Sequence, residues 1–290
     1  MHAPLRIVKV VTPPVKWPAE AIWEQVAPIL PGFTVEILPE IDSTNTELMR
    51  RAKMGQTEPV LLVAEKQTAG RGRLGREWHD LSKRAESLPA LTFSLGMPLS
   101  PVDWSGLSLA VGISIAQSLH PNIGLKWPND LWLSDQTSDR KLAGILIETC
   151  AVGSQRYVVV GVGINITQPA QHPSAQQPLL RTPAAWLQEL LPQSSASEAL
   201  QRIALNLVQT ILMFSDHGFA SFQTRFNQLD VLKNRQVNVE NSVENSQANA
   251  VAQIKITGLA QGVNHMGELI LQTAQGLQTI NSSEVSVKPL

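Results

Sequence analysis

The chain has 290 residues, and at roughly 100–200 residues per domain this length predicts one large domain with a smaller one attached. Hydrophobic residues make up 43% of the chain and charged residues 16%, so it can bury a sizeable core. The formal net charge of -1 excludes a basic coat over the whole surface, as nucleic-acid binding would use, and leaves only local basic patches. The single cysteine, Cys150, cannot form an internal disulfide, and the Cys and His residues lack zinc-ligand spacing.

Residues 1–33 are rich in proline and predict an irregular extension with one short helix near residues 19–26. This segment is too short for an independent DNA-binding domain, so no DNA binding is expected. Apolar runs stay shorter than the roughly 18 residues of a membrane-spanning helix, and the first residues do not resemble a secretory signal. We therefore expect a cytoplasmic protein without membrane contact.

From residue 34 onward the pattern is orderly. Alternation at residues 35–37 predicts a strand, and the polar run after residue 42 predicts a helix start with Thr44 and Glu47 at capping-box spacing. Apolar residues at near-helical spacing predict a helix over residues 105–120. Further strands are predicted at residues 60–65, 91–95, 124–127, 131–133, 141–149 and 157–166, and two or three helices between residues 183 and 229.

The composition changes after residue 230. Asn, Gln and Ser crowd residues 234–250, and pairs of apolar residues alternate with period two at 237/239, 254/256, 269/271 and 285/287. Glycines at 258, 262, 267 and 276 are expected to be turns between these strands. The pattern predicts one large domain over residues 34–230 and a small β-barrel over residues 231–290.

The most distinctive segment runs from Lys66 to Arg76 and carries four positive charges, three glycines and no acid. Glycines let backbone N–H groups approach a ligand, and guanidinium groups match pairs of phosphate or carboxylate oxygens. Both features favour a mobile loop that closes over a phosphate-bearing intermediate. The alternatives are an RGG-like nucleic-acid segment or a solvated basic turn. It is not a P-loop, because the GxxxxGK[ST] pattern does not occur in this sequence.

Four other short motifs are ambiguous when each is taken alone. Residues 126–130 (KWPND) make a hairpin turn, or their Lys and Asp hold a phosphate and a divalent ion. Lys141 is a surface lysine at a strand start, or its ammonium is held near the interior by the apolar strand that follows. Residues 161–165 (GVGIN) indicate a close approach of backbone or ligand, and residues 43–45 (STN) are typical of a helix cap.

All five motifs occur in one order over residues 41–166, and in that order the chain resembles the biotin protein ligase family. The closing residues 284–287 also resemble the C-terminal strand of that family. The resemblance is to the form without an N-terminal DNA-binding domain. It implies an α+β catalytic domain, a mixed sheet with flanking helices of the class II synthetase type, followed by a small SH3-like β-barrel.

The resemblance implies a two-step, ATP-dependent reaction. Biotin is activated to biotinyl-5'-adenylate and is then transferred to a lysine of the biotin carboxyl carrier protein of acetyl-CoA carboxylase. ATP with Mg²⁺ and biotin are the implied substrates and metal, and no tightly bound prosthetic group is expected. A homodimer is compatible with the family.

Site residues are carried over from the family's motifs. Three residues are implied to be catalytic: Lys141 stabilises charge in the transition state, and Arg71 and Arg73 organise the loop over biotin and the phosphates. Biotin is assigned to Ser43, Thr44, Asn45, Gln67, Arg71, Gly72, Arg73, Lys141, Gly144, Gly161 and Gly163. The nucleotide is assigned to Arg73, Arg76, Trp78, Lys126 and Asn165, and Asp130 is assigned to magnesium through the phosphates.

The sequence departs from the family pattern at two places. Residues 79–89 are polar and lack a glycine that the family usually has there, and Leu74 stands where some relatives have Arg. Three rival functions remain open at this point: a lipoate or octanoate transferase, a nucleic-acid-binding module, and a biotin sensor without catalysis. The presence of Lys141 and the arginines argues against a sensor, and the net charge and few aromatic residues argue against nucleic-acid binding.

Overall fold

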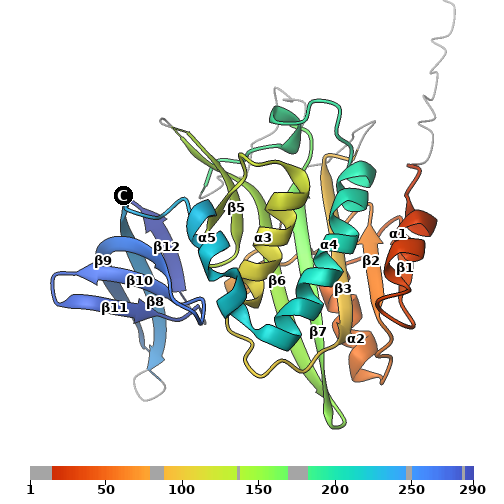
Figure 1. The fold of residues 1–290 in the computed structure, drawn as a ribbon, viewed down its shortest axis with the longest axis horizontal. Coiled ribbons are helices and arrows are strands. Elements are labelled where there is room, and N and C mark those ends of the chain that lie inside the picture. Colours follow the sequence, from red (N-terminus) through yellow and green to blue (C-terminus); the bar gives the residue numbers. More distant parts are fainter. Residues whose placement is uncertain (1–14, 79–87, 136–137, 169–181, 246–249, 283–284) are drawn as a thin grey trace, which may run out of the picture.

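The computed structural model describes residues 15–78, 88–135, 138–168, 182–245, 250–282 and 285–290, which form two sheets (Figure 1). The larger sheet has seven strands in the order β1-β2-β3-β7-β6-β5-β4. Their bounds are β1 Thr34–Leu38, β2 Val60–Ala64, β3 Ala90–Pro98, β4 Gly124–Lys126, β5 Asp130–Ser134, β6 Asp139–Val152 and β7 Gln155–Asn165. β1 and β2 run parallel and the other neighbours antiparallel, which confirms the predicted mixed sheet.

Helices cover both faces of this sheet. Alternate residues of β7 point to opposite faces, so Val158 and Val160 join the main core whereas Tyr157 and Val159 join a smaller one. The main core lies under α3 and α4, which cross the sheet in Figure 1, and the smaller core lies under α2. The helix bounds are α1 Ala19–Val26, α2 Thr44–Lys53, α3 Leu107–Leu119, α4 Ala196–His217 and α5 Gln223–Leu229.

The start of α2 differs from the prediction by one residue. Ser43 is the N-cap: its backbone is extended and its hydroxyl accepts from the N–H of Thr46 at 3.4 Å. Thr44 is already helical and cannot cap, and Glu47 pairs with Arg50 and Arg51 instead of closing a capping box. The shift frees the Thr44 side chain for the interior, where it is 3% exposed.

The smaller sheet is antiparallel, with strand order β11-β10-β9-β8-β12. Its strands are β8 Gln236–Asn245, β9 Ala250–Val263, β10 Leu269–Thr273, β11 Gly276–Ile280 and β12 Val285–Pro289. The all-β prediction for this region is confirmed, but β11 was not predicted. Gly258 and Gly262 lie inside β9, the latter opposite a register shift, whereas Gly267 and Gly276 occupy turns with φ of 78° and 108°.

The smaller sheet packs beside the β4–β5 edge of the larger one, next to α5 (Figure 1). Trp127, which is fully buried, donates its indole N–H to the carbonyl of Gly267 at 3.0 Å. The N–H of Val231 donates to the carbonyl of Leu125 at 3.0 Å. These contacts hold the smaller sheet against the larger one.

Two sequence features fall where the structure gives no description. Residues 79–87 of the atypical polar segment and Glu284 of the closing motif lie outside the described residues. Within the described ranges, we find no helix long and apolar enough to cross a membrane.

Candidate active site

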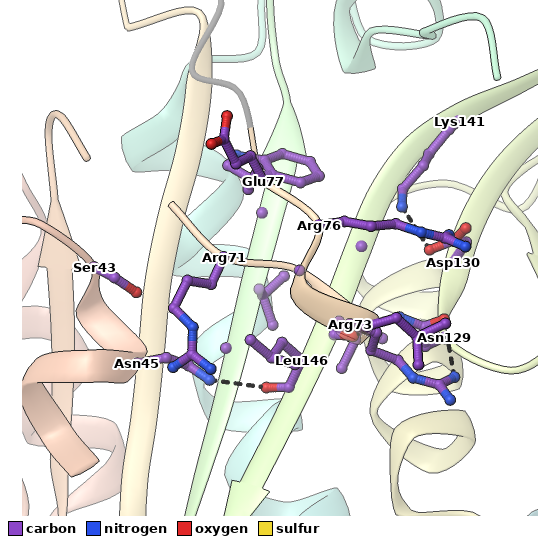
Figure 2. A pocket seen from close by; sticks show the side chains of 18 of the residues that line it. Ser43, Asn45, Arg71, Arg73, Arg76, Glu77, Asn129, Asp130, Lys141 and Leu146 are labelled. Atoms are coloured by element: carbon purple, nitrogen blue, oxygen red, sulfur yellow. Dashed lines mark hydrogen bonds and ion pairs between the residues drawn. The ribbon is translucent and has the colours of Figure 1, made fainter. Parts of the chain in front are cut away.

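One open pocket gathers the five sequence motifs. It encloses about 870 Å³ including its mouth, and Figure 2 shows Ser43 and Asn45 on one side of it and Asp130 and Lys141 on the other. Of the predicted site residues, which all lie in the described part of the chain, Asn165 alone does not line it. The lining residues are Ser43, Thr44, Asn45, Gln67, Arg71, Gly72, Arg73, Leu74, Arg76, Glu77, Trp78, Phe93, Lys126, Pro128, Asn129, Asp130, Lys141, Gly144, Ile145, Leu146, Gly161, Val162, Gly163, Val285 and Ser286.

On one side of the pocket, at the start of α2, the lining groups other than Arg71 are polar and uncharged. Ser43 and Thr44 are 2% and 3% exposed at the start of α2. The backbone N–H of Thr44 donates to Gln67 Oε1 at 2.8 Å, and Gln67 is placed by a backbone bridge to Ile41. Buried hydroxyl and amide groups without charge suit a neutral polar ligand that both donates and accepts hydrogen bonds.

Asn45 is used within the protein. Its Nδ2 donates to the carbonyl of Leu146 at 3.2 Å and to Glu148 Oε2 at 3.1 Å, and its Oδ1 accepts from the Ser94 hydroxyl at 2.6 Å. A Cβ added at Gly161 would lie 1.9 Å from that Oδ1. The glycine therefore makes room for the Asn45 amide, a function that the sequence did not indicate.

The Gly–Arg loop, which the sequence predicts to be mobile, has several partners within the protein. It is closed on itself by hydrogen bonds from the N–H of Gly72 to the carbonyl of Arg76 at 2.7 Å and from the N–H of Trp78 to the carbonyl of Gly70 at 2.9 Å. Arg71 forms an ion pair with Glu148 at 3.0 Å. The ion pair with Glu148 depends on β6, a strand far along the chain, which a local pattern does not reveal.

Arg73 reaches from the loop to the smaller sheet. Its guanidinium donates to the backbone carbonyl of Ser282 and to Asn129 Oδ1, the latter at 3.5 Å. Burial lowers the pKa of Arg73, partly offset by the nearby carboxylate of Asp130. The residue thus connects the loop, the β4–β5 turn and the β11–β12 connection.

Trp78 covers two of the glycines assigned to biotin. A Cβ at Gly163 would lie 2.5 Å from the indole ring, and one at Gly144 would lie 3.4 Å from it. The indole N–H is buried and has no hydrogen-bond partner among the described residues, which leaves a donor available to a ligand. Lys141 Nζ lies 6.0 Å from the centre of the same ring.

The opposite side of the pocket is cationic. Lys141 Nζ lies 2.7 Å from Asp130 Oδ1, and Lys126 is 8% exposed (Figure 2 shows the Lys141–Asp130 pair). Burial, together with repulsion from Lys141, Arg76 and Arg73, lowers the pKa of Lys126 to about 8 against the attraction of Asp130. The pKa of Asp130 is lowered, because the two lysines outweigh the effect of burial. The excess of positive charge suits a polyanion such as a triphosphate.

Asn165 has a position different from the predicted one. Its Nδ2 donates to the carbonyls of Lys141 and Ala185 at 3.2 and 3.1 Å. The N–H of Lys141 also donates to the carbonyl of Pro183 at 2.8 Å. Asn165 therefore holds the backbone that carries Lys141, and it lies outside the pocket lining.

A magnesium ion fits this pocket only through the phosphates. Within the described residues, no group of three or more His, Cys, Asp or Glu side chains could hold a metal. Asp130 offers one carboxylate, which is already paired with Lys141. Mg²⁺ is commonly bound by one or two carboxylates together with substrate phosphates, so this donor set is compatible with the assignment.

Known proteins resemble this chain over nearly its whole length. The bifunctional ligase/repressor BirA of Escherichia coli is 30% identical over 273 residues, which cover 91% of this chain and 77% of BirA. This chain belongs to the biotin protein ligase family. A model of the biotin/lipoate A/B protein ligase family matches residues 37–165, and one of the biotin protein ligase C-terminal domain matches residues 251–288. The chain is therefore a ligase, and it has the C-terminal domain of the biotin branch.

Two further relatives support this membership. The biotin–[acetyl-CoA-carboxylase] ligase of Mycobacterium tuberculosis is 39% identical over 145 residues, covering 46% of this chain and 50% of the relative. The solved structure of the biotin protein ligase from Aquifex aeolicus in complex with biotin and ATP is 25% identical, with a TM-score of 0.67 over 88% of this chain and 99% of that one.

For this member of the biotin protein ligase family, the sequence did not indicate two residues that hold the site. Ser94 is fully buried on β3 and belongs to none of the five motifs. Glu148 is half-buried on β6, the strand that also carries Lys141, and nothing in the sequence assigned it a partner. Neither could have been found without the pairing of β3, β6 and β7.

Proposed function

We propose that this chain activates biotin with ATP to biotinyl-5'-adenylate and transfers the biotin to a lysine of the biotin carboxyl carrier protein of acetyl-CoA carboxylase. The observation that carries the proposal is the division of this pocket into an uncharged side at Thr44 and Gln67 and a cationic side at Lys126 and Lys141. The first side suits the neutral ureido head of biotin and the second suits phosphates. A relative named biotin–[acetyl-CoA-carboxylase] ligase supports the carrier assignment.

Lys141 has the central role in the first step. A biotin carboxylate oxygen attacks the α-phosphorus of ATP, the bond between that phosphorus and the β-phosphate bridging oxygen breaks, and pyrophosphate leaves. Two anions must approach each other, so a cation beside both lowers the barrier, and holding the two reactants together contributes ~7–11 kcal/mol. Lys141, oriented by Asp130 at 2.7 Å, and Arg73 are the groups we assign to this charge.

Arg71, Arg76 and Trp78 complete the proposed ligand contacts. We assign Arg71 to the loop over biotin, Arg76 to the phosphates and Trp78 to the nucleotide, where its unpartnered indole N–H is available. Asp130 is the residue that we assign to magnesium, which would neutralise phosphate charge when bound. In the second step the carrier amine attacks the activated carbonyl, AMP leaves, and the amine loses a proton.

The test is a mass measurement on product. Wild-type protein is incubated with biotin, ATP, Mg²⁺ and a biotin carboxyl carrier domain, and parallel arms replace biotin by lipoate or octanoate. We expect biotinyl-adenylate without the carrier, and a carrier heavier by one biotinyl group when it is present. Modification by lipoate or octanoate instead would assign the chain to the rival ligase class, and no adenylate from any acid would contradict the proposal. We propose a cytoplasmic location, which is compatible with a reaction that consumes ATP.

A further inference from the structure

A chain of buried hydrogen-bonding groups leads from the pocket into the sheet. It runs from Gln67 through Thr44, Ser94 and Asn45 to Glu148, and we call these five residues the buried chain. Ser94 Oγ lies 2.7 Å from Thr44 Oγ1 and 2.6 Å from Asn45 Oδ1. Thr44, Asn45 and Ser94 are 3%, 4% and 0% exposed, so water does not replace these contacts.

The far end of the buried chain determines the orientation of the Asn45 amide. Asn45 Nδ2 lies 3.2 Å from the Leu146 carbonyl and 3.1 Å from the Glu148 carboxylate. Both groups accept hydrogen bonds, since one is a backbone carbonyl and the other is the carboxylate paired with Arg71. The donating nitrogen must therefore face them, and the oxygen must face Ser94.

That orientation determines where the hydroxyl protons lie. Asn45 Oδ1 only accepts, so it takes its hydrogen bond from the Ser94 hydroxyl. The Ser94 hydroxyl also donates to Thr44 Oγ1 at 2.7 Å. The proton of Thr44 is therefore directed away from Ser94, and the Thr44 hydroxyl donates to Gln67 Oε1 at 3.2 Å.

The near end of the buried chain consequently presents one acceptor and one donor to the pocket. Thr44 Oγ1 accepts from Ser94 and donates its proton to Gln67 Oε1, so its remaining lone pair can only accept. Gln67 Oε1 is held by the Thr44 backbone N–H at 2.8 Å, which leaves Gln67 Nε2 as a donor. An acceptor beside a donor matches an N–H beside the C=O of a ureido group.

We propose that Ser94 and Asn45 are positioning residues for biotin, which fix the proton of Thr44 so that its oxygen accepts from the ureido ring. This deepens the proposed function and rests on biotin being the ligand. Asn45 then acts through Ser94 and Thr44 and does not contact biotin itself, since its amide is occupied within the protein.

The experiment is a double-mutant cycle on biotin affinity. The dissociation constants of biotin and of ATP are measured by calorimetry for the wild type, Ser94→Ala, Thr44→Val and the double variant. We expect Ser94→Ala to weaken biotin binding about tenfold, with ATP binding unchanged. We expect the double variant to equal Thr44→Val alone, because Ser94 acts only through the Thr44 hydroxyl.

Ser114→Ala is the matched control. Ser114 is also a buried serine, 4% exposed on α3, and its hydroxyl has no hydrogen-bond partner among the described residues. This variant should bind biotin and ATP as the wild type does. It separates the loss of any buried hydroxyl from the loss of the one in the buried chain.

The other outcomes contradict either the inference on Ser94 or the proposed function. Independent effects of the two substitutions, or equal losses of biotin and ATP affinity in Ser94→Ala, would show that Ser94 supports the fold and does not position Thr44. Wild-type biotin affinity in Ser94→Ala would overturn the inference and leave the proposed function intact. A wild-type chain that binds no biotin would overturn the proposed function as well.

Discussion

At the scale of single residues, the contact between Lys141 and Asp130 decides what the cationic side can do. The 2.7 Å pair holds the lysine ammonium inside the pocket, and its backbone is held by Asn165 and Pro183. A flexible surface lysine would lose its side-chain entropy on binding, whereas this one is already placed. The geometry therefore favours the interpretation that the Lys141 ammonium is held near the interior over the interpretation that Lys141 is a surface lysine.

Replacing Lys141 tests this assignment. Lys141→Ala should lower the rate of adenylate formation by ~10²–10³-fold, because it removes charge that is needed mainly in the transition state. Biotin affinity should fall less. Pyrophosphate release measures the rate, and Lys66→Ala, which loses an exposed lysine paired with Glu40 at 2.6 Å, is the control. Near-normal turnover in Lys141→Ala would make it a surface lysine.

Lys126 should make nucleotide binding depend on protons. Its pKa is about 8 in the ligand-free chain because of burial and three neighbouring cations, and phosphates would raise it. ATP binding at about pH 8.5 should therefore take up a proton, whereas binding at about pH 6.5 should not, since the lysine is then already charged. Calorimetry in buffers of different ionisation enthalpy measures the uptake. Persistence of the uptake in Lys126→Met would assign it to another group.

At the scale of elements, the Trp78 indole packs on two glycines, Gly144 of β6 and Gly163 of β7. A side chain at Gly163 would collide with the indole at 2.5 Å, although neither residue is near the other in sequence. The position of the loop that carries Trp78 therefore depends on the glycines in these two strands.

Gly163→Ala should displace Trp78 without unfolding the chain. We expect ATP affinity to fall at least about tenfold, ~1.4 kcal/mol, because the assigned nucleotide contact moves. Gly112→Ala on α3 is the control, since its nearest contact would be the end of the Leu125 side chain at 3.1 Å. Equal ATP affinity in the wild type and Gly163→Ala would show that Trp78 does not contact the nucleotide.

At the scale of the whole molecule, the junction at residue 230 connects the two sheets. The Asp230 backbone bridges Leu125 of β4, and Asp230 Oδ1 accepts from the N–H of Leu232 at 2.9 Å. Its Oδ2 is buried and has no hydrogen-bond partner among the described residues. Burial raises the pKa of Asp230 to about 6, against the weaker effects of the Leu232 N–H and Lys233.

The junction should therefore make stability depend on pH. The pKa of the Asp230 carboxyl is raised in the folded chain, so folding favours its protonated form. Below the ordinary pKa of 3.8 the carboxyl does not lower the free energy of unfolding, and its ionisation destabilises the fold as the pH rises through about 6. Asp230→Asn should gain on the order of 2–3 kcal/mol in the free energy of unfolding above that window and little at about pH 4. Denaturant titrations at both pH values measure this, and a gain that does not change with pH would exclude the carboxyl as its source.

Local patterns in the sequence determined the elements and the content of the site. The helix at residues 19–26, the strands of the mixed sheet and the pocket residues other than Asn165 are where they were expected. The helix and the strands depend on spacing within a few residues, because side-chain periodicity decides which face of an element is apolar. The pocket residues were assigned by the resemblance of five motifs to the biotin protein ligase family. The sequence did not predict β11, because its apolar residues do not follow the period-two pattern of a strand with one buried face. Leu277, for example, is 63% exposed.

Only the tertiary structure decided which side chains meet. Arg73 donates a hydrogen bond to the carbonyl of Ser282, 209 residues away, and Asn45 donates one to Glu148, 103 residues away. Asn165 turns to the backbone of Lys141, although its motif suggested the nucleotide. The physical reason is that a hydrogen bond needs a partner within about 3.5 Å in the correct direction. Sequence specifies the donors and acceptors, but the pairing and register of β3, β6 and β7 determine which of them lie that close.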